Sequence, residues 1–90
     1  MLKIVSSTQF KRDLKQAKKR SYDMLKLQKV VDILALGQQL DEKYCDHDLT
    51  GRYHGFRECH IEPDWLLVYR IDRSELELFL FRNGTHGDLF

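Results

Sequence analysis

The chain has 90 residues, of which 42% are hydrophobic and 32% charged, and its formal net charge is +1. These values are typical of one soluble globular domain, which we expect to span residues 1–90. No apolar run approaches the roughly 18 residues that a membrane span requires. The apolar start, Met1–Val5, is too short for a signal peptide. We therefore expect a cytoplasmic protein with no membrane partner.

The charge is unevenly distributed. Residues 1–36 contain nine Lys or Arg and three Asp, whereas residues 37–90 contain six basic and eleven acidic side chains. A basic first part favours an anionic partner, either a nucleic acid or an acidic protein segment. A solvated helix face would account for the same charges, so both interpretations stay open.

A strand is expected at residues 3–5, followed by a first helix. The hydroxyl residues 6–8 offer N-caps, because their side-chain oxygens can accept a free N–H of the first turn. Phe10, Leu14 and Ala17 recur at helical spacing and define its apolar face. Lysine and arginine occupy much of the rest, which predicts an amphipathic and strongly basic helix.

A second helix is predicted next. Ser21 or Asp23 can cap its start, and Gly37 can end it in a left-handed conformation. The short interval before it favours an antiparallel helical hairpin. Its buried stripe is expected to contain four residues: Met24, Leu27, Val31 and Leu34.

The rest of the chain predicts a sheet. Residues 38–51 are irregular and polar, and we expect a loop there. Three segments rich in branched and aromatic residues follow, at residues 56–61, 65–71 and 76–82. Short turns separate them, so they should form an antiparallel meander. The predicted fold class is α+β, with an N-terminal helical hairpin packed on a small, mainly antiparallel sheet.

Cys45 and Cys59 lie fourteen residues apart and form no Cys-x-x-Cys pair. In a cytoplasmic chain we expect both to be free, buried thiols, and a disulfide is the lesser alternative.

The candidate chemistry lies at the borders of the predicted strands, where His47, His60, His86 and Arg82 occur. RNA cleavage without a metal requires a base for the 2′-hydroxyl, an acid for the leaving 5′-oxygen and a cation for the phosphate. Histidine titrates near neutral pH and can act as either acid or base. Arginine matches phosphate oxygens with two parallel hydrogen bonds. The residue types are therefore suited to phosphodiester cleavage.

Other interpretations of single residues remain. Trp65 and Phe90 could stack on unpaired bases, but Trp65 could equally be core, and Phe90, as the last residue, could be frayed. Arg82 follows Leu76, Leu78 and Leu80 at intervals of two, so a regular strand would point it to the same face as these leucines. Either the strand ends there and turns the side chain outward, or the partner of Arg82 lies at the sheet rim.

Zinc is a competing expectation, because His47, His60, His86 and Asp64 are suitable ligand types. However, none of them has a local ligand spacing such as His-x-x-x-His, and Arg82 would repel a cation. We therefore expect no metal and no other cofactor.

Three separated motifs carry a family resemblance. They are Asp46-His47-x-Leu49-x-Gly51, then Phe56-Arg57-Glu58-x-His60-Ile61-x-Pro63-Asp64-Trp65-Leu66-Leu67-Val68-Tyr69, then Arg82-x-Gly84-Thr85-His86-x-x-Leu89-Phe90. Their order and spacing closely resemble the YafQ branch of the RelE/ParE toxin superfamily. The resemblance implies a microbial-RNase-like fold and a toxin of a type II toxin–antitoxin system. It also implies a ribosome-dependent endoribonuclease that cleaves mRNA without a metal.

The resemblance also implies roles for individual residues. His86 would be the general acid, Arg82 the phosphate clamp, and His47 or Asp64 the base. His60 would contact the phosphate or orient its neighbours. The substrate-binding aromatic residues would be Trp65 and Phe90. Asn83 and Gly87 depart from the Thr and Ser that are common in the family.

The implied partners are a cognate antitoxin, the ribosome and mRNA. The toxin alone would be a monomer, and it would form a hetero-oligomer with its antitoxin. Because the superfamily also contains ParE-like toxins, a non-enzymatic toxin that binds a topoisomerase is the alternative function.

Overall fold

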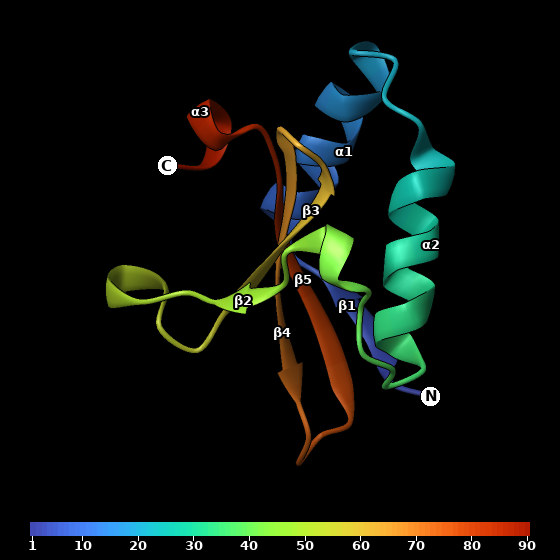
Figure 1. Cartoon of the computed structure of the whole chain (residues 1–90), viewed down its shortest axis with the longest axis vertical. Helices are drawn as coiled ribbons and strands as arrows, with labels where there is room; N and C mark the ends of the chain where they lie inside the picture. Colours follow the sequence, from blue (N-terminus) through green and yellow to red (C-terminus); the bar gives the residue numbers. More distant parts are fainter.

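The computed structural model describes all 90 residues and contains a five-stranded sheet in the order β1-β5-β4-β3-β2 (Figure 1). The edge strand β1 is parallel to β5, and all other pairs are antiparallel. The strands are β1 (Lys3–Ser6), β2 (His47–Asp48), β3 (Arg57–Glu62), β4 (Trp65–Asp72) and β5 (Glu77–Gly84). The predicted meander is therefore confirmed, and β1 extends it into a mixed sheet.

The segment predicted as a loop, residues 38–51, contains some regular secondary structure. It contains a single 3₁₀ turn, η1 (Glu42–Tyr44), and the two-residue strand β2. A second 3₁₀ turn, η2 (Gly51–Tyr53), follows before β3. Neither turn nor β2 is long enough to produce a periodic pattern, so the prediction of a plain loop was wrong here.

Two helices precede this segment, α1 (Thr8–Lys19) and α2 (Met24–Ala35). Ser7 caps α1 by accepting a hydrogen bond from the N–H of Phe10, and Asp23 caps α2. Gly37, with φ of +75°, ends α2 in a Schellman motif. The N–H of Gly37 donates to the carbonyl of Leu34, and the next N–H donates to the carbonyl of Ile33. The helix termini predicted from the sequence are thus confirmed. None of the helices is long and apolar enough to cross a membrane.

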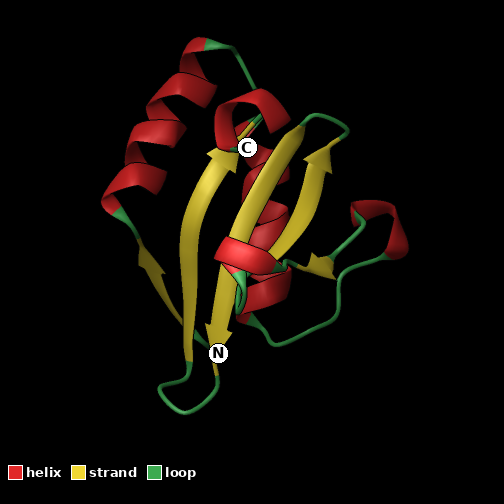
Figure 2. Cartoon of the chain, turned by 90° about the vertical axis from the view of Figure 1, so that its left-hand side faces the viewer, coloured by secondary structure: helices red, strands yellow, loops and turns green.

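The main core lies between these two helices and one face of the sheet. Figure 2 shows α1 alongside the β1–β5 side of the sheet and α2 behind its middle. The predicted stripe of α2 is buried at Leu27, Val31 and Leu34, while Met24 is half-buried. The strands contribute seven side chains to this core, which are Cys59, Ile61, Trp65, Leu67, Tyr69, Leu78 and Leu80.

The opposite face of the sheet carries a smaller apolar cluster of Leu66, Val68 and Leu89. Leu89 belongs to α3 (His86–Leu89), a single helical turn that stands in front of the sheet in Figure 2. No periodic pattern in the sequence predicts α3, which is only four residues long. Its start is fixed by a capping box, in which Thr85 and Asp88 exchange side-chain-to-backbone hydrogen bonds.

A β-bulge decides where Arg82 lies. Tyr69 pairs with Leu80 and Val68 pairs with Arg82, so Phe81 is the extra residue of β5. The bulge reverses the alternation, and Arg82 leaves the face of the buried leucines. Its partner is at the sheet rim, which confirms one of the two alternatives left open by the sequence.

The two cysteines are free, as predicted. Cys59 is fully buried, and this burial raises the pKa of its thiol far above the usual value. Cys45 is exposed instead of buried, because it ends η1 in a left-handed conformation that turns the chain away from the core.

Candidate active site

One row of side chains crosses four strands on the face opposite the helices. His47 pairs with Glu58, Glu58 with Val68, and Val68 with Arg82. Paired residues of neighbouring strands point to the same face. Because strands lie about 4.8 Å apart, the backbone of Arg82 is roughly 10 Å from that of Glu58. Residues from distant parts of the sequence therefore share one surface.

His60 lies in the centre of the three candidate histidines. It comes two residues after Glu58 on β3, so it shares the face of the row. Its ring centroid is 6.5 Å from that of His47 and 5.7 Å from that of His86. The structure thus brings together the three histidines that the sequence singled out, and we call them the histidine cluster.

Asp64 holds His86 in place at one end of the cluster. Its Oδ1 atom accepts the backbone N–H of His86 at 3.0 Å and lies 2.7 Å from the ring Nδ1. These hydrogen bonds lower the pKa of Asp64, so the carboxyl group is ionised at neutral pH. An ionised carboxylate only accepts hydrogen bonds; therefore Nδ1 carries the proton. The other ring nitrogen, Nε2, is left for the substrate.

His47 is fixed at the other end. Its Nδ1 atom lies 2.7 Å from the carbonyl oxygen of Cys45. A carbonyl can only accept, so Nδ1 donates, and in the neutral ring the lone pair is on Nε2. The acidic neighbours Asp46 and Asp48 both bind Arg57 on β3, which ties β2 to the sheet on either side of His47.

Glu58 was not among the predicted site residues, although it lies within the cluster. It is 5% exposed, and its carboxylate is 3.5 Å from Nε2 of His60. Its position two residues before His60 on a predicted strand was the signal that could have identified it. One donor atom from each of Glu58, His60 and His86 lies within 4.8 Å of the others. This trio, rather than the set with His47 and Asp64, has the arrangement of a potential metal site.

Arg82 is bound at the rim of the sheet by Asp13 of α1. Its Nε and Nη2 atoms donate to the two carboxylate oxygens at 2.9 and 3.1 Å. The ion pair raises the pKa of Arg82, which stays charged in any case. Nothing in the sequence pattern indicated Asp13, because it lies 69 residues from Arg82.

Trp65 does not have the predicted position. Its side chain is only 2% exposed, and its ring packs against Tyr22 with centroids 4.9 Å apart. Its Nε1–H donates to Oδ1 of Asn83 at 3.1 Å. The prediction that this ring stacks on a base was wrong, because both ring faces lie in the core between the helices and the sheet.

Phe90 is more than half exposed, at 57%, and α3 keeps it near the site. Its ring meets the ring of Tyr53 edge-on, with centroids 5.3 Å apart. Tyr53 in turn lies 6.4 Å from Phe81 on β5. Phe90 therefore stays the candidate for base stacking, and Tyr53 supports it from the loop before β3.

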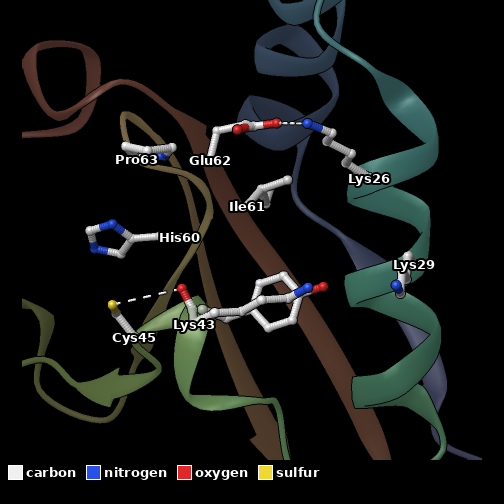
Figure 3. A pocket seen from close by; sticks show the side chains of 9 residues that line it. Lys26, Lys29, Lys43, Cys45, His60, Ile61, Glu62 and Pro63 are labelled. Carbon is white, nitrogen blue, oxygen red and sulfur yellow. Dashed lines mark hydrogen bonds and ion pairs between the residues drawn. The ribbon is translucent and has the colours of Figure 1, made fainter.

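A basic hollow of about 540 Å³ adjoins the cluster on the far side of His60 (Figure 3). It lies between α2 and the end of β3, which β2 is too short to cover. We call it the lysine hollow, after Lys26, Lys29 and Lys43 in its lining. Glu62 forms an ion pair with Lys26 and so does not offset the positive charges of Lys29 and Lys43.

The comparisons with known proteins agree on one family. Residues 2–90 match the sequence model of the YafQ family, described as the bacterial toxin of a type II toxin–antitoxin system. The mRNA interferase toxin YafQ of Escherichia coli K12 is 40% identical over 85 residues, which cover 93% of this chain and 90% of the relative.

Solved structures give the same result. A metal-bound toxin from Helicobacter pylori has a TM-score of 0.94 and 50% identity, with both chains fully covered. YafQ in the E. coli DinJ–YafQ complex has a TM-score of 0.91 and 38% identity, covering all of this chain and 99% of that one. These matches confirm the α+β class and do not favour the ParE-like alternative. The chain belongs to the YafQ family of bacterial toxins of type II toxin–antitoxin systems.

Proposed function

We propose that this toxin is an endoribonuclease that cleaves mRNA on the ribosome, by acid–base catalysis that needs no metal. One observation carries the proposal. His47 and His86 stand on either side of His60, and each has its Nδ1 atom engaged by a fixed acceptor. Two Nε2 atoms are thereby available, one on each side of the position that a phosphate would occupy. The name of the E. coli relative, mRNA interferase toxin, supports the same activity.

The base in this mechanism is His47. Its Nε2 lone pair accepts the proton of the 2′-hydroxyl as that oxygen attacks the neighbouring phosphorus atom. Asp64 is the weaker candidate for this role. Its Oδ1 atom already accepts two hydrogen bonds from His86, and its lowered pKa makes it a poor proton acceptor at neutral pH.

The acid is His86. In its protonated form it donates the Nε2 proton to the 5′-oxygen, as the bond between phosphorus and that oxygen breaks. Asp64 stabilises the positive imidazolium ring and keeps the ring oriented. The products are a 2′,3′-cyclic phosphate and a free 5′-hydroxyl, so the two protons balance.

The negative charge that grows on the phosphate is met by Arg82 and His60. Arg82 has its Nη1 group free, because Asp13 engages Nε and Nη2. The ring of His60 lies between those of His47 and His86, with its Nε2 atom 3.5 Å from the buried carboxylate of Glu58. This arrangement places the guanidinium of Arg82 and a polar ring where charge develops.

A modified mRNA tests the chemistry. Purified toxin is added to programmed ribosomes, and new 5′ ends are mapped by primer extension. A single 2′-deoxynucleotide before the cleaved bond should abolish that cut, and His86→Ala should abolish all cuts. A chelator selective for transition metals, which leaves ribosomal magnesium in place, should have no effect. Cleavage of the deoxy substrate, or loss of cleavage with the chelator, would contradict the mechanism.

A cognate antitoxin is the proposed protein partner, since YafQ of E. coli is found in a complex with DinJ. Residues 1–36 carry nine basic and three acidic side chains. They can bind an acidic antitoxin segment or ribosomal RNA, and competition between the two would neutralise the toxin. The location that follows from a ribosomal target is the cytoplasm.

The lysine hollow is the proposed contact for the RNA backbone beside the cut. His60 forms its wall, so a strand whose scissile phosphate lies at the histidine cluster can direct a flanking phosphate toward Lys29 and Lys43. The double change Lys29→Gln/Lys43→Gln should weaken ribosome binding and lower its salt dependence by about two charges. Arg70→Gln/Arg73→Gln, a pair of exposed residues outside this basic part of the chain, is the matched control. An equal effect of both pairs would assign the loss to net charge alone.

A divalent ion is a possible inhibitor. The H. pylori relative is described as metal-bound, and Glu58, His60 and His86 offer suitable donors here. A metal on these donors removes the proposed acid, His86, from proton transfer. Zinc should therefore bind the isolated toxin, by calorimetry, and slow cleavage, and Glu58→Gln should weaken the binding. Faster cleavage with zinc would instead favour a metal-dependent enzyme.

A further inference from the structure

We propose that Asp13 and Arg20 of α1 are positioning residues that hold the two ends of the catalytic segment, residues 82–88. We call this pair of contacts the α1 clamp. Asp13 binds Arg82 near the start of the segment, and Arg20 binds Asp88 at its end. The inference rests on the proposed nuclease function, and it adds residues that themselves touch no substrate.

The Asp13 contact replaces a missing strand. β1 ends at Ser6, which pairs with Leu80, and the hydroxyl of Ser7 donates to the carbonyl oxygen of Phe81, so beyond that point no strand pairs with β5 on this side. The carboxylate of Asp13 accepts the backbone N–H of Asn83 at 3.1 Å, in addition to its two bonds from Arg82. With a side chain only 9% exposed, Asp13 is shielded from competing water. It fixes both the strand and the guanidinium group.

The Arg20 contact holds the helix that carries His86. Arg20 donates from Nη1 and Nη2 to the two carboxylate oxygens of Asp88, at 2.6 and 3.1 Å. The same carboxylate accepts the N–H of Thr85 at 2.9 Å, which closes the capping box of α3. A single helical turn is not stable by itself in water. The tether from α1 therefore helps to keep the first residue of α3, His86, in a defined place.

The spacing of the clamp matches that of its targets. Asp13 lies within α1 and Arg20 is the C-cap of that helix, seven residues on, which is two turns and about 10.5 Å along one side of the helix. Their charges are negative then positive, whereas those of Arg82 and Asp88 are positive then negative. A shifted docking would oppose like charges, so one arrangement is selected. Phe10 and Ala17 are buried and anchor α1 to the core.

A purely structural role is the competing explanation, and the test is designed to separate the two. Single-turnover cleavage on programmed ribosomes is measured with wild-type toxin, Asp13→Asn and Arg20→Gln. We expect the cleavage rate to fall about 10²-fold in Asp13→Asn, with the half-saturating ribosome concentration unchanged. Val31→Ala, a core change on α2, is the control for stability. It should leave the rate per folded molecule unaltered.

Two further readouts report on position directly. A phosphorothioate at the scissile phosphate should slow wild-type toxin more than Asp13→Asn, because a displaced Arg82 no longer senses that atom. For the other contact, Arg20→Lys, which keeps one charged donor for Asp88, should retain much of the activity that Arg20→Gln removes.

The outcomes are distinct. If wild-type toxin does not cleave, the proposed function fails. If it cleaves and both single variants match it in rate and phosphorothioate effect, the clamp is wrong. The clamp would also be overturned if Asp13→Asn and Arg20→Gln lost activity only in proportion to the fraction of unfolded protein. Their rates would then equal that of Val31→Ala at the same folded fraction.

Discussion

Asp64 and His86 are joined twice, through the ring Nδ1 and through the backbone N–H, across 22 residues of sequence. The first contact fixes the tautomer and the second fixes the start of α3. Because one oxygen, Oδ1, accepts both, a small change in Asp64 alters the chemistry and the position of His86 together.

Asp64→Asn should lower the single-turnover cleavage rate by about 10²- to 10⁴-fold, with little change in ribosome binding. The amide retains an oxygen that can accept from the backbone, but it lacks the charge that stabilises the protonated ring. The rate is measured on programmed ribosomes, and binding by co-sedimentation.

The double variant Asp64→Asn/His86→Ala should be no slower than His86→Ala alone, because residues that act as one unit give non-additive losses. A fully additive loss in the double variant would show that Asp64 acts independently of His86. It would then return to consideration as the base.

Much of this site could be predicted from the sequence, because strand alternation and short turns determine which residues share a face. The sequence places the three histidines, His47, His60 and His86, at the borders of predicted strands, and the sheet brings them together. Arg82 needed the bulge at Phe81 to leave the leucine face, and a bulge leaves no periodic signal. The sequence predicts a partner for Arg82 at the sheet rim only as one of two alternatives, and it does not identify Asp13 as that partner.

The parts that could not be predicted depend on long-range contacts. Asp13 and Arg20 appear in the sequence as two charges among many on a basic helix. Their roles come from partners 69 and 68 residues away, for which no local rule exists. Trp65 was ambiguous for a similar reason. An aromatic residue at the start of a strand can face either side, and the side is decided by the pairing of Leu67 with Asn83, which brings the amide of Asn83 within reach of the Trp65 ring.

The burial of Trp65 predicts a loss of stability, and not of substrate binding, when it is changed. Trp65→Phe keeps an aromatic ring against Tyr22 but removes the donor to Oδ1 of Asn83. Since Nδ2 of Asn83 already has no partner, the amide would be left wholly unsatisfied. The free energy of unfolding should fall by about 1–3 kcal/mol, measured by urea denaturation.

Cleavage per folded Trp65→Phe molecule should stay close to that of wild type. A large loss of ribosome binding by a variant that is still folded would restore the prediction that this ring stacks on a base.

Phe90 should give the opposite result. Its ring is 57% exposed, so Phe90→Ala should leave the unfolding midpoint almost unchanged. If a base stacks on the ring, its loss weakens substrate binding by about 1–3 kcal/mol. Titration of single-turnover rates against ribosome concentration measures this loss. Phe90→Trp should retain the affinity, whereas equal affinities for the alanine variant and wild type would exclude stacking.

The ion pair of Asp88 predicts a dependence of stability on pH. The hydrogen bonds from Arg20 and then from Thr85 hold the pKa of this carboxyl group well below its usual range. In the unfolded chain the pKa is about 3.9. A folded pKa below the unfolded value gives a stabilisation that is complete above about pH 5 and is lost as the pH falls through the folded pKa. Asp88→Asn should therefore be less stable than wild type near neutral pH.

The difference between wild type and Asp88→Asn should shrink as the pH falls below about 4. Urea midpoints of both proteins at a series of pH values measure it, and subtraction removes the titration of the other carboxylates. Glu75→Gln, in the exposed β4–β5 turn, is the matched control and should give no such trend. If the difference for Asp88 stayed constant down to about pH 2, its stabilising effect would come from hydrogen bonding within the capping box. The charge of Arg20 would then have no part in it.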